Sequence, residues 1–146
     1  MSRVIGADRV LQNLRKFGAD FEAEVSKAVA TTAHQVRTSA VRKIQRDAAT
    51  GRVYVLSSPN RTHQASAPGQ PPATDTGALA SSIAAIIDGP YRARVGTALD
   101  YGFYLEHGTT SIEPRPWLHP SLLGARPDHE RRLNRVFQSA ARRIQP

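Results

Sequence analysis

An apolar stripe with helical spacing runs through the first third of the chain and restricts the folds that the remainder can build. Apolar side chains recur between residues 7 and 48 at steps close to 3.6 residues, at Val10, Leu11, Leu14, Phe17, Phe21, Val25, Val29, Val36, Ala40 and Ile44. An unbroken helix of roughly forty residues would be ~60 Å long, more than the rest of this chain can cover. The stripe therefore predicts either a kink near Gly18, with Asp20 capping a restarted helix, or a helix that packs against other chains.

The charge of the chain is strongly basic and concentrated at both ends. The 146 residues include 20 Lys and Arg against 12 Asp and Glu, a net charge of +8. Residues 1–49 and residues 126–146 each carry +4, and seventeen of the basic residues are Arg. Such a field attracts polyanions or acidic protein faces, and Arg forms bidentate contacts with either. A solvated helix surface is the alternative interpretation.

Composition excludes several classes of protein. With no cysteine, the chain has no disulfide, no thiolate zinc site and no cysteine nucleophile. Residues 1–7 lack an apolar signal core and no apolar run approaches the length of a membrane span, so we expect neither secretion nor a membrane. The length fits a single domain over residues 1–146, with an extended arm at about residues 50–75.

The arm is predicted to be a projecting hairpin followed by an extended tether. Residues 51–56 are typical of a strand, residues 57–60 of a turn and residues 61–65 of a returning strand. Three prolines in residues 67–72 then block both helix and central strand. We expect the arm to become ordered against a partner, with the candidate inter-subunit residues Arg52, Tyr54, Leu56, Arg61 and His63.

The second half of the chain predicts short elements and then a final helix. Residues 76–82 favour a helical turn, residues 83–88 and 92–97 favour strands joined at Gly89-Pro90, and Gly108 should end a helical turn over 101–107. Residues 117–123 favour a further helical segment. Pro127 suits the first turn of a last helix, whose apolar face comprises Leu133, Val136, Phe137, Ala140 and Ile144. The predicted fold class is α+β: a long N-terminal helix, a small antiparallel sheet with a projecting hairpin arm, and a C-terminal helix.

The titratable residues do not indicate a catalytic centre. The five histidines show no metal-binding spacing, and the chain has no nucleophile elbow and no phosphate-binding loop. We therefore expect no catalytic, metal-binding or cofactor-binding residues, no cofactor and no enzymatic activity. A small hydrolase that uses Glu106 and His107 is one alternative. We prefer a structural role in which Glu106 pairs with Arg115 or accepts the amides of the Gly108-Thr109 turn.

The spacing of three further residues predicts a packed face. Tyr101, Tyr104 and Leu105 stand at i, i+3 and i+4, and we expect this face to lie in the core.

The basic charge of the chain is compatible with nucleic-acid binding, with a sequence pI of about 10.8. However, the chain has no zinc finger, no aromatic RNA-binding motif and no basic zipper. A basic DNA-binding accessory protein, whose arms and terminal helices grip phosphate, is therefore the runner-up function.

Three sequence blocks together resemble a known family. They are Pro72–Ile83 (PATDTGALASSI), Tyr101–Thr109 (YGFYLEHGT) and Pro114–Ser121 (PRPWLHPS). Their order and spacing resemble the HK97-type gene-product-ten family of tailed-phage tail components or neck proteins, over most of residues 4–140. The arm resembles that of the longer-armed members. The departures are small: Trp117 stands where Phe is usual, Ser121 where Ala is usual, and His107 where an aromatic residue is frequent.

The resemblance implies a structural subunit of a tailed-bacteriophage virion. It implies a homo-oligomeric ring of six or twelve copies at the head–tail junction (neck, connector or tail completion), which joins head to tail around the DNA channel. The implied partners are adjacent head-completion and tail-terminator or tail-tube proteins, and DNA that passes without sequence-specific binding. The implied location is the virion, after synthesis in the host cytoplasm. The matching motif residues are Thr76, Gly77, Leu79, Ser82, Tyr101, Tyr104, Leu105, Glu106, Gly108, Thr109, Arg115, Pro116, Trp117 and Pro120.

Overall fold

A computed structural model of the chain describes residues 6–47, 49–57 and 60–144. Its elements, in chain order, are α1 (Ala7–Arg46), β1 (Val53–Ser57), β2 (Asn60–Gln64), α2 (Ala78–Ser82), β3 (Ala84–Gly89), β4 (Arg92–Gly96), α3 (Asp100–His107) and α4 (His119–Ile144). The predicted α+β class is confirmed, with a long helix at each end of the chain. The middle of the turn expected over residues 57–60 lies outside the described residues.

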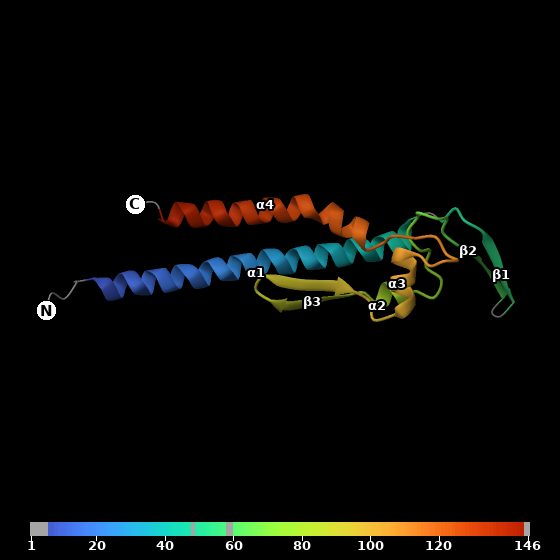
Figure 1. The fold of residues 1–146 in the computed structure, drawn as a ribbon, viewed down its shortest axis with the longest axis horizontal. Coiled ribbons are helices and arrows are strands. Elements are labelled where there is room, and N and C mark those ends of the chain that lie inside the picture. The colour runs from blue at the N-terminus through green and yellow to red at the C-terminus, as the bar shows by residue number, and fades with distance from the viewer. Residues whose placement is uncertain (1–5, 48, 58–59, 145–146) are drawn as a thin grey trace.

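Helix α1 is one uninterrupted helix of 40 residues (Figure 1). The predicted kink near Gly18 is wrong, and Asp20 caps no restarted helix, because both residues lie inside α1. A glycine in a helix interior costs only about 1 kcal/mol relative to alanine, which the hydrogen bonds on either side outweigh. The other alternative that the stripe left open, packing against other chains, therefore carries more weight.

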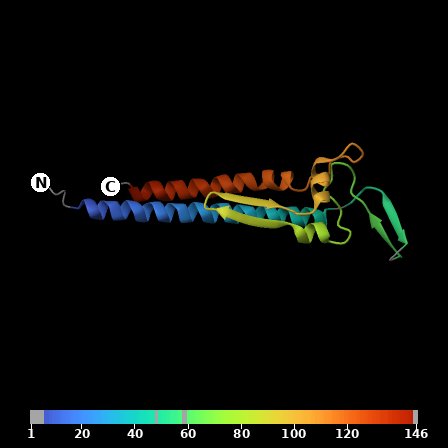
Figure 2. The ribbon, with the colours of Figure 1, turned by 60° about the horizontal axis from the view of Figure 1, so that its bottom comes forward.

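Helix α4 runs back alongside α1, and both views show the two helices side by side (Figures 1 and 2). No new helix begins at Pro127, because α4 is continuous from His119 and contains this proline. Proline removes one backbone donor from the helix, but buried positions on both sides, at Ala125 and Ala140, hold α4 against α1. The first turns of α4 accordingly run at an angle to the rest of the helix (Figure 1).

The four strands form two separate antiparallel hairpins and not one sheet. Strand β3 pairs with β4 from Ala84↔Gly96 to Gly89↔Arg92, with a bulge between Ile87 and Gly89. This hairpin lies along α1 (Figure 2). Its residues alternate: Ala93 and Val95 are half-buried, whereas Arg94 is exposed. Strand β1 pairs with β2 at the opposite end of the molecule from the two termini (Figure 1).

The main core lies at the C-terminal half of α1, where α2, α3 and the start of α4 meet it. Its buried members are Ala40, Ile44, Leu79, Ala80, Ile83 and Trp117. Trp117 is 2% exposed, and its indole Nε1 donates to the carbonyl oxygen of Gly102 at 3.3 Å. Any larger residue at Gly102 would force its neighbours to shift, because a Cβ there would lie 2.5 Å from Cγ2 of Thr97 and 3.1 Å from Cδ1 of Leu79.

The N-terminal turns of α1 extend beyond the end of α4 (Figures 1 and 2). We call residues 7–16 the overhang. All of its residues are exposed, including Val10 at 57%, Leu11 at 52% and Leu14 at 60%. The predicted apolar stripe is thus covered from Val25 onward and uncovered in the overhang.

Candidate functional site

The three sequence blocks fold into one joint at the core end of the molecule, and Glu106 holds two of them together. Its carboxylate Oε2 accepts the backbone amides of Trp117 at 2.7 Å and Leu118 at 2.9 Å. Its Oε1 accepts the amide of His119 at 2.8 Å. Glu106 of α3 therefore caps the start of α4, where unpaired amides and the helix dipole favour a negative charge.

This geometry corrects both roles that the sequence suggested for Glu106. The amides that it accepts belong to the start of α4 and not to the Gly108-Thr109 turn. Among the residues that the structure describes, no ion pair joins Glu106 to Arg115. Arg115 contributes its backbone instead, donating its amide to the carbonyl of Leu105 at 2.7 Å. Sequence spacing alone could not place the amides, because Trp117 lies eleven positions after Glu106 in the chain.

The turn between α3 and α4 requires a glycine at position 108. Gly108 has φ 76°, and its amide donates to the carbonyl of Tyr104 at 2.8 Å to close α3. A Cβ at this position would lie 2.7 Å from the carbonyl oxygen of Ile112. The hydroxyl of Thr109 accepts the amides of Ser111 and Ile112, so the turn is held from within. Pro116 and Pro120 are half-buried beside Trp117.

The first block builds the other wall of the joint. Gly77 has φ 78° and precedes α2, and the hydroxyl of Thr76 accepts the amide of Ala78 at 3.3 Å. Leu79 is buried in the core. The hydroxyls of Ser82 and Thr97 lie 2.6 Å apart and connect α2 to the segment after β4.

The predicted core face of α3 is wrong for its two tyrosines. Tyr101 is 44% exposed and Tyr104 is 51% exposed, and only Leu105 packs against the core. The helix has eight residues and turns Gly102 toward Trp117, so the tyrosines face outward. Phe103 is also 61% exposed, and its ring stacks on His107 with centroids 4.4 Å apart. Together these aromatic side chains form an uncovered surface.

The arm exposes one apolar face of its hairpin. Val53 is 55% exposed and Val55 is 74% exposed, and they pair across the hairpin with Gln64 and Thr62. On the opposite face, Arg61 forms an ion pair with Asp75 at 2.5 Å, and Leu56 is half-buried. An isolated two-stranded hairpin is marginally stable in water, so contacts such as the Arg61–Asp75 ion pair help to hold the arm in place.

The three other predicted arm residues contribute to the inward face and to the base of the hairpin. Nδ1 of His63 lies 3.9 Å from the carboxylate of Asp75, and the guanidinium of Arg52 lies 5.3 Å from the ring centroid of Tyr54. The side-chain oxygen of Gln70 accepts the backbone amide of Ala67 at 2.9 Å and the hydroxyl of Thr50 at 3.1 Å. These contacts fix the base of the arm, and no sequence pattern indicated a role for Gln70.

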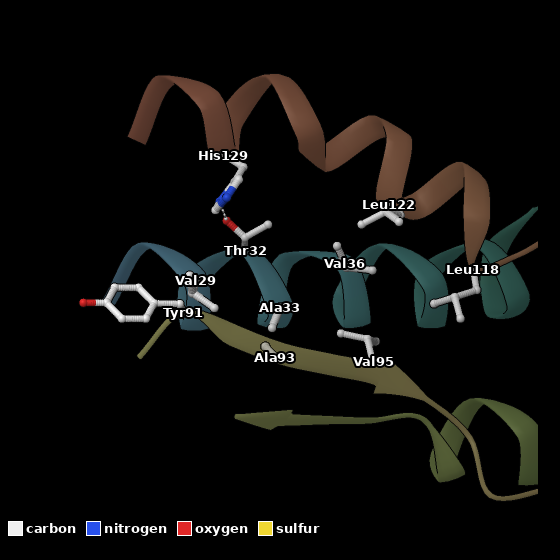
Figure 3. Close-up of a pocket in the computed structure, with 10 residues that line it drawn as sticks. All are labelled: Val29, Thr32, Ala33, Val36, Tyr91, Ala93, Val95, Leu118, Leu122 and His129. Carbon is white, nitrogen blue, oxygen red and sulfur yellow. Dashed lines mark hydrogen bonds between the residues drawn. The ribbon is translucent and has the colours of Figure 1, made fainter. Parts of the chain in front are cut away.

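An apolar groove of about 380 Å³ opens between α1, α4 and β4. Val29, Ala33 and Val36 of α1 form its floor, Leu118 and Leu122 stand on the α4 side, and Ala93 and Val95 of β4 face them (Figure 3). At one end the hydroxyl of Thr32 lies 2.9 Å from Nδ1 of His129. The sequence did not predict this groove, because its lining residues come from elements that are far apart in the chain.

The chemistry of these surfaces favours assembly over catalysis. Both oxygens of Glu106 accept backbone amides, and Nδ1 of His107 lies 3.2 Å from the carbonyl oxygen of Phe103. The carboxylate of the alternative hydrolase is therefore already occupied by the amides at the start of α4. Over the described part of the chain, no cluster of three or more His, Asp or Glu side chains is arranged to hold a metal ion.

The comparisons with known proteins identify the family. A model described as "Bacteriophage HK97-gp10, putative tail-component" matches residues 8–108. The chain therefore belongs to the HK97-gp10-like family of phage tail components, and the expected family is confirmed. Neither the curated proteins nor the solved structures gave a match.

Family membership supports the expected structural role in a phage particle. A tail component is a structural part of the phage particle and contacts other phage proteins. The match covers α1 from Asp8 onward, the arm, the first block and the second block as far as Gly108. Among the described helices, none is both long enough and apolar enough to cross a membrane.

Proposed function

We propose that this protein is a ring-forming subunit at the head–tail junction of a tailed-phage virion, where it joins head to tail around the DNA channel. The ring is a homo-oligomer of six or twelve copies in the neck, connector or tail-completion position. Its neighbours are head-completion proteins on one side and tail-terminator or tail-tube proteins on the other. Residues 1–146 act in it as a single domain with an arm at about 50–75.

The observation that carries this proposal is the placement of uncovered apolar surfaces at separate positions along one elongated chain. The overhang stands at one end, the exposed face of the arm at the other, and the groove between them (Figures 1 and 3). Different surfaces on one subunit suit heterologous contacts, in which one surface of a copy meets a different surface of the next. Repeated around an axis, such contacts close into a ring.

In this proposal the arm residues and the motif residues have different tasks. Arg52, Tyr54, Leu56, Arg61 and His63 shape a hairpin that reaches a neighbouring copy or the next ring. The exposed strand edges of such a hairpin can pair through backbone hydrogen bonds, which need few side-chain pockets. The motif residues around Glu106 and Trp117 keep α3 and α4 rigid, so that the arm and the long helices hold fixed directions.

The test is disruption of the gene in its phage or prophage, with complementation from a plasmid and electron microscopy of the lysates. DNA-filled heads and finished tails lying unattached, and rejoined when the plasmid supplies the protein, are the expected result. Normal infective particles in the disrupted strain would refute the proposal. Empty heads would also refute it, and would favour the basic DNA-binding accessory protein instead.

A further inference from the structure

The outer flank of α4 carries a straight stripe of arginine and glutamine. Arg131, Arg135, Gln138 and Arg142 recur at i, i+4, i+7 and i+11, which places them on one face of the helix. All four are exposed. We call these four residues the arginine stripe. At 1.5 Å per residue, it extends for ~16 Å along the helix axis.

Two other arginines of α4 have partners on α1 and so are structural, whereas Arg126 pairs with Glu130 within α4 itself. Arg132 donates to Oγ1 of Thr32 at 3.1 Å and to Oε1 of Gln35 at 2.7 Å. Arg143 forms an ion pair with Glu24 at 2.8 Å. These contacts dock α4 on α1, and they leave the arginine stripe on a different flank of the helix.

The stripe itself is largely uncompensated. Arg131 pairs with Asp128 at its N-terminal end, whereas Arg135 and Arg142 form no ion pair among the described residues. The sequence has no acidic residue from Arg131 to Pro146. Positive charge therefore accumulates along this flank, where a counter-charge must come from solvent ions or from a partner.

The shape and composition of the flank indicate which anion it fits. Two shallow hollows of about 320 and 330 Å³ lie along it, lined by Arg131, Asn134, Arg135, Gln138, Ser139, Arg142 and Arg143. Every lining side chain can donate a hydrogen bond, and none is apolar or aromatic. Protein–protein interfaces centre on apolar and aromatic residues, whereas phosphate backbones are held by Arg together with polar donors. The flank thus suits a phosphate backbone better than an acidic protein face.

We propose that the arginine stripe contacts the phosphate backbone of duplex DNA without reading its sequence. Duplex DNA carries one negative charge per ~1.7 Å of its axis, so a stripe of this length can meet several phosphates at once. Within the ring, and resting on the proposed function, this contact turns the outer flank of α4 toward the DNA channel. The side of the molecule that carries the β3–β4 hairpin is then left for contacts between subunits.

The test is the salt dependence of binding between the full chain and a fluorescently labelled 30-base-pair duplex, followed by fluorescence anisotropy. The variant R131Q/R135Q/R142Q removes the stripe's charge, and R9Q/R15Q/R42Q removes the same charge from exposed positions on α1. We expect the stripe variant to lose most binding at moderate salt. Its slope of log affinity against log salt should fall by about 2 to 3, since each released phosphate contact contributes about 0.9. The α1 variant should keep a slope close to that of the parent chain.

A second pair of variants and a second ligand distinguish the remaining outcomes of this experiment. If circular dichroism shows that the triple variant is unfolded, the double variant R135Q/R142Q can be compared with R9Q/R15Q instead. This pair gives the same comparison and leaves the Arg131–Asp128 ion pair intact. Equal losses in the stripe and α1 variants would overturn the proposal, because binding would then follow net charge alone. Loss of polyglutamate binding with unchanged duplex binding would overturn it in favour of an acidic protein partner.

The outcome is separable from the test of the proposed function. If particles assemble normally without the protein, the junction role fails whatever the salt slopes are. If the stripe variant binds duplex like the parent chain, the DNA contact fails even where gene disruption separates heads from tails.

Discussion

At the scale of single residues, the least expected feature is the anionic cap that α3 supplies to α4. Glu106 is far from the start of α4 in sequence, but its two carboxylate oxygens accept three of the backbone amides there. Charge-assisted bonds to orphan amides are among the stronger hydrogen bonds in proteins. A residue that resembles half of a catalytic pair in sequence therefore acts as a structural clamp.

Replacing Glu106 by alanine should destabilise the fold by about 2 kcal/mol, because the amides of Trp117 and Leu118 lose their acceptor. Glu106→Gln should cost less, since its amide oxygen can still accept. Glu113→Ala, at an exposed position in the neighbouring turn, is the matched control. Chemical denaturation measures all three, and a Glu106→Ala protein as stable as the Glu113→Ala protein would contradict the capping role.

At the scale of elements, the continuity of α1 across Gly18 is a property that can be measured. A Cβ at position 18 would meet nothing within 4 Å, and the residue lies in the helix interior. Gly18→Ala should therefore raise stability by up to about 1 kcal/mol and increase the helical signal at 222 nm. Ala19→Gly, one residue further along the same exposed segment, should have the opposite sign. A loss of stability in Gly18→Ala would indicate that the chain does bend at this glycine.

The stability of the packing between α1 and α4 should depend on pH through the carboxylate of Asp128. Its carboxylate accepts Nε2 of Gln35 at 2.6 Å, and this bond, helped by Arg131 and Arg132, lowers the pKa of Asp128 below its usual value of 3.8. A group whose pKa is lower in the folded state stabilises the fold above its unfolded pKa. That contribution disappears as the pH falls through the folded pKa.

Asp128→Asn should therefore lower the melting temperature at pH 7, and the difference from the parent protein should shrink below about pH 4. The asparagine keeps an oxygen for Gln35, so the comparison reports mainly on the charge. Thermal unfolding followed at pH 7, 5 and 3 gives the measurement. A difference that stays constant with pH would show that the charge of Asp128 does not hold α4 in place.

At the scale of the whole molecule, the structure separates a packed joint from exposed surfaces toward its ends. Trp117 and its neighbours close the joint, and the two long helices carry the overhang and the stripe away from it (Figure 1). The arm leaves the joint in the other direction. This arrangement allows changes in the arm to affect assembly without affecting the fold.

Val55→Asp should leave the melting temperature of the isolated protein nearly unchanged but prevent complementation of the disrupted phage. The side chain of Val55 is 74% exposed, so a charge there costs the folded chain little. If this face is buried against a neighbouring subunit, the same charge would be unpaired and would oppose the contact. Thr38→Asp, an exposed position of α1, provides the matched control. Plaque titres measure complementation, and a normal titre for the Val55→Asp phage would rule out this face of the arm as a contact.

Local patterns predicted much of the fold because the forces behind them act over a few residues. The 3.6-residue stripe predicted α1, and turn chemistry at Gly89-Pro90 predicted the β3–β4 hairpin close to its observed bounds. Gly108 ends α3 as expected, because only a residue without Cβ fits φ 76° beside Ile112 and Pro114. The three blocks were enough to indicate the family, which the family comparison confirmed.

Tertiary structure decided everything that depends on which distant segments meet. Local propensity favoured breaks at Gly18 and Pro127, but the helical hydrogen bonds and the α1–α4 contact outweigh them. Tyr101 and Tyr104 are exposed because Trp117 already fills the core beside Gly102. Arg132 and Arg143 likewise have partners only because α1 places Gln35 and Glu24 beside them. Sequence by itself determined the elements, since these follow from neighbours along the chain. Packing determined the surfaces, since these follow from neighbours in space.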